Sequence, residues 1–77
     1  MPTVIIDGYK FRFYSSDLNE PPHMHVLHGE KEAKIWLRPL SLEYNHGYGQ
    51  TEMNRILKLA SQNQTQLMEA WNGYFHP

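Results

Sequence analysis

Residues 19–26 read Asn-Glu-Pro-Pro-His-Met-His-Val, and this stretch constrains the fold more than any other part of the chain. The two prolines fix φ and push the residue before them out of the helical region, so the backbone must arrive extended. Side chains of a strand alternate between its two faces. The stretch therefore predicts a strand that carries His23 and His25 on one face, with the other face formed by Met24 and Val26.

Length and composition indicate a small globular protein. The 77 residues predict a single small domain over 1–77, and 40% hydrophobic residues are typical of a folded chain. The absence of cysteine excludes disulfides and thiolate metal sites. A net charge of −1 means that any anion binding must be local. No apolar run reaches the roughly 18–20 residues of a membrane span and no signal peptide is recognisable, so we expect a cytoplasmic protein.

The first half of the chain predicts an antiparallel sheet of four to five short strands. A β-branched run leads into Asp7-Gly8, a strong hairpin signal, and residues 9–14 then alternate between two faces. Residues 15–22 are expected to be a polar loop, since they show no repeating period. The predicted strands are about 3–7, 9–14, 23–28, 32–37 and 40–44.

The second half predicts two helices, about 50–61 and 63–74, although one kinked helix also fits the pattern. Apolar residues recur at helical spacing in both parts, and the six residues 61–66 between them are polar and uncharged. Gly49 and Glu52 have the spacing of an N-cap and its N3 partner. Helices that cover one face of the sheet give a two-layer α+β fold.

The helices should cover the sheet face that carries Phe11, Phe13, Met24, Val26, Ile35, Leu37 and Leu42. In the fifth strand, Leu40, Leu42 and Tyr44 should share a face. The opposite, open face then gathers four of the seven basic residues with aromatic residues and both histidines: Lys10, Arg12, Tyr14, His23, His25, Lys34, Trp36 and Arg38. Such a surface attracts anions and suits single-stranded nucleic acid. The alternative is an ordinary solvated sheet face, and a register slip of one residue would bury both histidines.

Six motifs occur in order along the chain: Met1-Pro2-Thr3-Val4, Gly8-Tyr9-Lys10-Phe11, Glu20-Pro21-Pro22-His23-Met24-His25-Val26, Ala33-Lys34-Ile35-Trp36-Leu37, Asn45-His46-Gly47-Tyr48 and Glu69-Ala70-Trp71. In these motifs the chain resembles a bacterial family catalogued as a domain of unknown function, number 4160. The resemblance implies a small single-domain protein, often encoded beside a second short protein. It therefore implies a two-protein module of the toxin–antitoxin kind, and it supplies no catalytic residues.

We accordingly expect a small protein partner encoded nearby, bound through the open face or through the aromatic end of the chain. RNA is the alternative ligand, and a homodimer is also open. The aromatic residues Trp71, Tyr74 and Phe75 are predicted to belong to the core, or else to form an apolar patch for a second copy or a cognate protein.

Metal binding is a second hypothesis for the histidine pair. His23 and His25 could share one ion, with His28 or Glu30 as a third ligand. Strand alternation places His28 on the opposite face, so a third ligand would have to come from a bulge or from the loop that holds Asp17 and Glu20. We therefore expect neither a native metal nor a cofactor.

Acid–base catalysis is a third hypothesis. His23 or His25, with Arg12 as the cation (or Lys34 or Arg38 in its place), would supply the groups of a small metal-independent ribonuclease toxin. The structural alternative is that one imidazole hydrogen-bonds a loop carbonyl and holds the Pro-Pro turn. The sequence favours a binding module over the ribonuclease and leaves open whether the protein is an enzyme.

Overall fold

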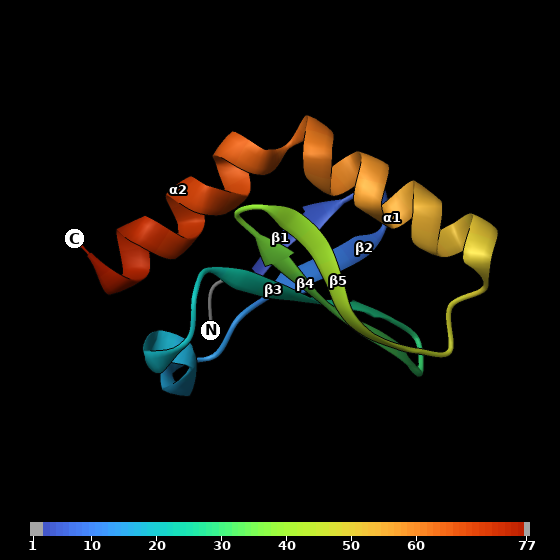
Figure 1. The fold of residues 1–77 in the computed structure, drawn as a ribbon, viewed down its shortest axis with the longest axis horizontal. Coiled ribbons are helices and arrows are strands. Elements are labelled where there is room, and N and C mark those ends of the chain that lie inside the picture. The colour runs from blue at the N-terminus through green and yellow to red at the C-terminus, as the bar shows by residue number, and fades with distance from the viewer. Residues whose placement is uncertain (1–2, 77) are drawn as a thin grey trace.

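The computed structural model describes residues 3–76, so the termini of the domain predicted over 1–77 lie outside the described residues. Its strands are β1 (Thr3–Ile6), β2 (Tyr9–Arg12), β3 (His23–His28), β4 (Lys31–Leu37) and β5 (Leu40–His46). Its helices are the 3₁₀ turn η1 (Ser15–Asn19) and the α-helices α1 (Gln50–Gln62) and α2 (Gln64–Phe75). The prediction of a five-stranded α+β fold is confirmed (Figure 1).

The sheet is an antiparallel meander in the order β1-β2-β3-β4-β5, which makes β3 the central strand. Asp7 and Gly8 join the first two strands with φ of 53° and 87°, as a tight hairpin turn of mirror-image type requires. Pairing of the central hairpin begins before β3 itself, because the Leu37 N–H donates to the Pro22 carbonyl at 3.0 Å. The prolines therefore lead directly into the middle of the sheet.

The two α-helices lie together over one face of the sheet (Figure 1). They are separate helices that meet at Asn63, which is the C-cap of α1 and the N-cap of α2. The prediction that Glu52 caps α1 is wrong: Gly49 is the N-cap, but no side chain bonds there. The Glu52 carboxylate instead accepts hydrogen bonds from the Tyr9 hydroxyl at 2.8 Å and from Lys31 Nζ at 3.1 Å.

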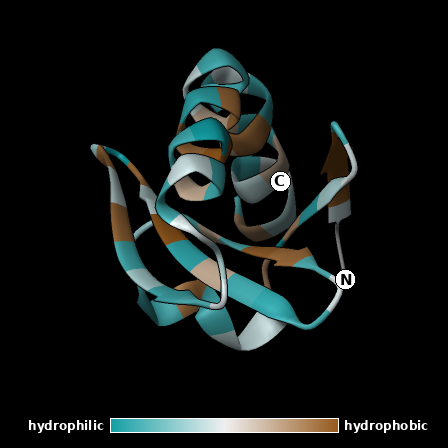
Figure 2. Ribbon diagram, turned by 90° about the vertical axis from the view of Figure 1, so that its right-hand side faces the viewer, coloured by the Kyte–Doolittle hydropathy of each residue, from teal (hydrophilic) through white to brown (hydrophobic). Residues whose placement is uncertain are grey.

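The core lies between the helices and the sheet, and the strands alternate between hydrophobic and hydrophilic positions (Figure 2). Six of the seven residues predicted on this face are at most 1% exposed: Phe11, Phe13, Met24, Val26, Ile35 and Leu37. The seventh, Leu42, is 43% exposed, so its assignment to the core is wrong. It lies on β5, an outer strand of the sheet, and has a neighbouring strand on one side only.

The aromatic end of α2 belongs mainly to the core. The rings of Trp71, Tyr74 and Phe75 lie 5.1, 5.5 and 5.3 Å from the ring of Phe13. Trp71 is 2% exposed, whereas Tyr74 is 44% exposed and forms the edge of this cluster. None of the helices among residues 3–76 has the length and apolar character needed to cross a membrane.

The loop after β2 is more ordered than predicted, because it contains η1. The Asp17 N–H donates to the Tyr14 carbonyl at 2.9 Å, and the Glu20 N–H donates to the Asp17 carbonyl at 3.1 Å. In Figure 1 this turn, in cyan, lies on the side of the sheet opposite the helices. The open face is therefore covered at one end.

The contrast between Ile35 and Leu42, which are paired across β4 and β5, tests the assignment of the core. Because Ile35 is fully buried, Ile35→Val should lower the free energy of unfolding by about 0.5–1.5 kcal/mol. Leu42→Ala removes more atoms but should change it by no more than about 0.5 kcal/mol, as is usual for surface sites. Urea denaturation of both variants measures this, and a larger loss from Leu42→Ala would contradict the assignment.

Candidate functional site

Three side chains converge where η1 meets the first residues of β3. Asp17 Oδ2 lies 3.1 Å from His23 Nε2 and 3.6 Å from His25 Nε2. One potential ligand atom from each of the three residues lies within 4.8 Å of the other two. We refer to Asp17, His23 and His25 as the Asp-His-His cluster. Carboxylates and imidazoles are groups that ligate metal ions and exchange protons.

His23 is held rigidly in the interior. It is fully buried, and its ring is flanked by the rings of Trp36 and Trp71 at 5.6 and 5.1 Å. Its Nδ1 lies 2.9 Å from the Pro21 carbonyl oxygen, so this nitrogen carries the proton and donates. The expectation that one imidazole holds the Pro-Pro turn is therefore confirmed. The placement of His23 on the exposed surface is wrong, because η1 and the two indoles enclose it.

His25 lies on the same side but nearer to solvent, with 12% of its side chain exposed. Its Nδ1 is 3.2 Å from Glu32 Oε2, and the ring of Tyr14 packs 5.0 Å away. Asp17 is fixed from the other direction, since the Tyr14 N–H donates to Asp17 Oδ2 at 2.9 Å. Each member of the cluster thus has a partner that orients it.

A β-bulge brings a further residue to the site. The pairing of β4 with β5 shifts between Lys34 and Ile35, so that Ile35 faces Leu42 but Lys34 faces Tyr44. The predicted alternation therefore fails at Glu43, and Tyr44 does not share the face of Leu42. Its hydroxyl donates to Glu32 Oε2 at 2.7 Å and lies 3.4 Å from His25 Nδ1.

Glu32 and Tyr44 perturb each other. The hydrogen bond from Tyr44 holds the pKa of Glu32 below its ordinary value; burial opposes this shift, and His25 assists it. Burial and the same hydrogen bond raise the pKa of Tyr44 to about 12. The Glu32 side chain therefore stays ionised, and the Tyr44 hydroxyl stays a donor, across the physiological range of pH.

The open face carries acidic as well as basic side chains. Lys34 pairs with Glu20, and its Nζ lies 4.7 Å from the centre of the Trp36 ring. The Trp36 Nε1–H donates to Glu43 at 3.3 Å. Of the four basic residues predicted on this face, Lys10, Arg12, Lys34 and Arg38, only Lys34 forms an ion pair with an acidic residue among residues 3–76.

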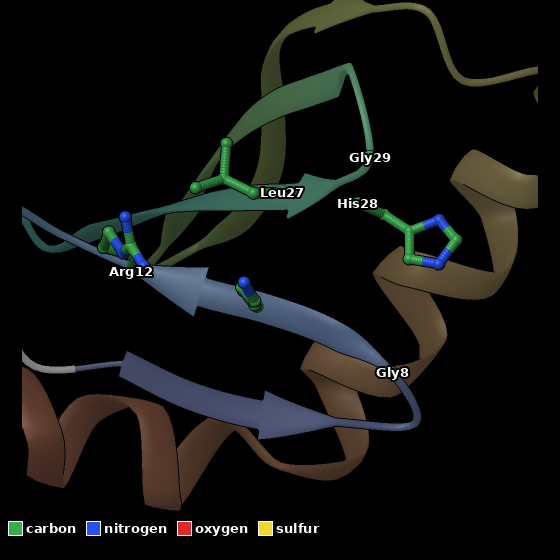
Figure 3. Close-up of a pocket in the computed structure, with 6 residues that line it drawn as sticks. Gly8, Arg12, Leu27, His28 and Gly29 are labelled. Carbon is green, nitrogen blue, oxygen red and sulfur yellow. The ribbon is translucent and has the colours of Figure 1, made fainter.

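Arg12, the predicted catalytic cation, lies opposite His25 in the pairing of β2 with β3. Its Nε donates to the Thr3 hydroxyl at 3.1 Å. Arg12 also lines a surface pocket of about 240 Å³ whose other residues are Gly8, Lys10, Leu27, His28 and Gly29. Figure 3 shows Arg12 and Leu27 on the neighbouring strands at this pocket. His28 extends from the end of β3 toward Tyr9, whose ring is 5.1 Å away, on the helix side as predicted.

The sequence predicts the two histidines of the site and offers Asp17 as one possible third ligand. It does not identify Glu32 or Tyr44 as their partners. Strand alternation could have placed Glu32 at the site, because residues 32 and 34 of one strand lie on the same face. The bulge that redirects Tyr44 has no comparable sequence signal.

Comparisons with known proteins place the chain in a family. The family model described as "Domain of unknown function (DUF4160)" matches residues 8–72. No curated protein and no solved structure matches the chain. The resemblance inferred from the motifs is confirmed, and the roles of the site residues must come from their geometry.

The link between Tyr44 and Glu32 has a measurable pH dependence. Folding lowers the pKa of Glu32, so its carboxylate adds to the free energy of unfolding at pH values above its unfolded-state pKa. This contribution is lost as the pH falls through the folded-state pKa. Tyr44→Phe should raise the pKa of Glu32 and lower the free energy of unfolding at pH 7 by up to about 1 kcal/mol. The difference from wild type should shrink as the pH falls through the folded-state pKa of Glu32, because the protonated carboxyl no longer gains from this hydrogen bond.

Denaturation at pH 7 and over a series of lower pH values, together with an NMR titration of the Glu32 carboxyl carbon, would measure these effects. Tyr74→Phe is the matched control, because the Tyr74 hydroxyl has no hydrogen-bond partner among residues 3–76. An unchanged titration of Glu32 in Tyr44→Phe would contradict the assignment.

Proposed function

Because this chain belongs to the DUF4160 family of domains of unknown function, we propose a role from its own surfaces: it is the protein-binding component of a two-protein module in the cytoplasm. It binds a small partner encoded nearby through the open face of its sheet, and it regulates or neutralises that partner in the manner of a toxin–antitoxin pair. The observation that carries the proposal is the composition of this face.

Aromatic residues and arginine concentrate on the part of the sheet that neither α-helix covers. Tyr14, Trp36 and Tyr44 are half-buried there, and Arg38 is exposed at the turn after β4. Tryptophan, tyrosine and arginine are the residues enriched where protein interfaces concentrate their binding energy. The backbones of Trp36 and Tyr44 lie on the paired strands β4 and β5, so this part of the surface is preformed and costs little ordering on binding.

The charge of the open face favours a protein over RNA. Glu20 pairs with Lys34, and Glu43 lies against Trp36, so acidic groups interrupt the basic ones. Lys10 and Arg38, which have no ion-pair partner among residues 3–76, lie at opposite ends of the face in the strand register. A phosphate backbone is bound by continuous positive charge, whereas alternating charges suit a partner of mixed charge.

The ribonuclease alternative has weaker support. A general acid or base must come within hydrogen-bond reach of the substrate. His23 is fully buried, and the two nitrogens of His25 face Glu32 and Asp17. A metal-independent mechanism that uses either imidazole would require these contacts to open first.

Co-expression with the product of the adjacent gene tests the proposed interface. Wild-type protein should copurify with that product as a stoichiometric complex. Trp36→Ala and Arg38→Glu should each weaken the complex at least about 10-fold, as expected for an interface anchor. Lys58→Glu is the matched control, because Lys58 is exposed on α1, away from the open face. Calorimetry would measure the affinity of the wild type and of all three variants for the partner.

Retention of full affinity in both open-face variants would contradict the proposal. So would a homodimer that both variants disrupt, since a second copy would then occupy this face.

Purified protein should leave single-stranded RNA intact between pH 5 and 8. The physical reason is that both imidazoles are engaged by protein groups. Gel analysis of RNA after incubation measures this, with His25→Gln as the comparison. Cleavage by the wild type that His25→Gln abolishes would establish the enzyme instead, and RNA binding that weakens steeply with salt would indicate phosphate contacts.

A further inference from the structure

The Asp-His-His cluster has an unusual hydrogen-bond balance. His23 Nδ1 donates to a carbonyl oxygen, which can only accept, so the Nε2 atom of neutral His23 bears a lone pair. That lone pair faces the Asp17 carboxylate at 3.1 Å, and His23 Nε2 is buried with no hydrogen-bond partner among residues 3–76. A buried polar atom of this kind is normally satisfied by a partner.

His25 shows the same arrangement. Its Nδ1 lies against the Glu32 carboxylate, an acceptor, so the proton belongs on Nδ1 and the lone pair on Nε2. This Nε2 also points at Asp17 Oδ2, 3.6 Å away. Three acceptor atoms therefore converge with no hydrogen between them, although Asp17 Oδ2 also accepts the Tyr14 N–H from outside the cluster. A cation between them satisfies both Nε2 lone pairs and the carboxylate at once.

We propose that Asp17, His23 and His25 bind a divalent first-row transition ion through Asp17 Oδ2 and the two Nε2 atoms. Two imidazoles and one carboxylate are a borderline ligand set that suits Zn²⁺ and its neighbours, whereas Mg²⁺ and Ca²⁺ prefer oxygen alone. In a tetrahedral zinc site with bonds of about 2.0–2.1 Å, ligand atoms lie roughly 3.3–3.4 Å apart. The separations of 3.1 and 3.6 Å bracket this value.

The surroundings are those of a metal site. Histidine ligands characteristically donate their second N–H to a carboxylate or a backbone carbonyl, which fixes the ring and its tautomer. Glu32 provides the carboxylate for His25, and Pro21 provides the carbonyl for His23. The Tyr44 hydroxyl in turn orients Glu32. The side chain of His25 is 12% exposed, which gives the ion access from solvent.

The bound ion would tie η1 to β3, because Asp17 belongs to the former and both histidines to the latter. His28 and Glu30 are not needed as ligands: the third ligand comes from the loop that holds Asp17. The site lies beneath the open face, where Trp36 flanks His23, but ion binding and partner binding are measured separately, so either proposal can fail alone.

Titration of the metal-free protein with Zn²⁺ tests the site. Protein dialysed against EDTA and then against chelator-free buffer should bind one ion per chain by calorimetry, and its melting temperature should rise with added Zn²⁺. Asp17→Asn and His25→Gln should weaken binding by more than about 100-fold, whereas loss of the outer carboxylate in Glu32→Gln should weaken it about 10–100-fold. His46→Gln, which changes an exposed histidine of β5, should bind as the wild type does.

Far-UV circular dichroism would check that each variant is folded, and none of the variants changes the fully buried His23. Co²⁺ provides a second measurement, because imidazole ligation gives it a visible absorption band that His25→Gln should abolish. The proposal is overturned if the wild type shows no saturable Zn²⁺ binding, or if binding survives in both Asp17→Asn and His25→Gln. It is equally overturned if NMR with Zn²⁺ present shows a proton on His23 Nε2, since that proton would occupy the place of the ion.

Discussion

The pairing of β3 along both of its edges is the constraint on which the rest of the structure depends. β3 pairs with β2 on one side and with β4 on the other. The hydrogen bond from the Leu37 N–H to the Pro22 carbonyl fixes the register of β3 and β4 just before β3 begins. A shift by one residue would exchange its two faces. This register puts Met24 and Val26 under the helices and directs His25 to the open face.

Two departures from regular structure then build the site on that strand. η1 folds back beneath β3 and supplies Asp17, and the bulge in β5 turns Tyr44 toward Glu32 and His25. η1 places a carboxylate, and the bulge places a hydroxyl, beside imidazoles that a flat sheet would leave in solvent. Irregular backbone of this kind is common beside functional sites, because it redirects side chains that strand alternation cannot place.

The open face combines a rigid frame with mixed charge. The paired strands hold the aromatic rings in place, and the acidic residues offset the basic ones, so the face has the character of a protein interface. The Asp-His-His cluster lies at its covered end, where it joins the loop to the sheet. The two features meet at Trp36 and Tyr14, which pack against His23 and His25, but they rest on different interactions.

The sequence by itself determined the antiparallel meander, the helical second half and most of the core. These features follow from local rules: Asp7-Gly8 favours a tight turn, alternation separates Phe11 from Arg12, and helical spacing puts Met53, Ile56 and Ala60 on one face. Strand alternation also predicts that His23 and His25 lie on the same face of the sheet. Local rules fail for Leu42, whose exposure depends on its position in an outer strand.

Only the tertiary structure decided how the histidines are used. Asp17 and His23 are brought together by the path of a loop, and Tyr44 reaches Glu32 through a bulge, neither of which leaves a periodic signal. The burial of His23 depends on indoles from β4 and α2, which are distant in sequence. Periodicity assigns side chains to faces, but only the assembled fold decides which faces are covered and which polar atoms meet.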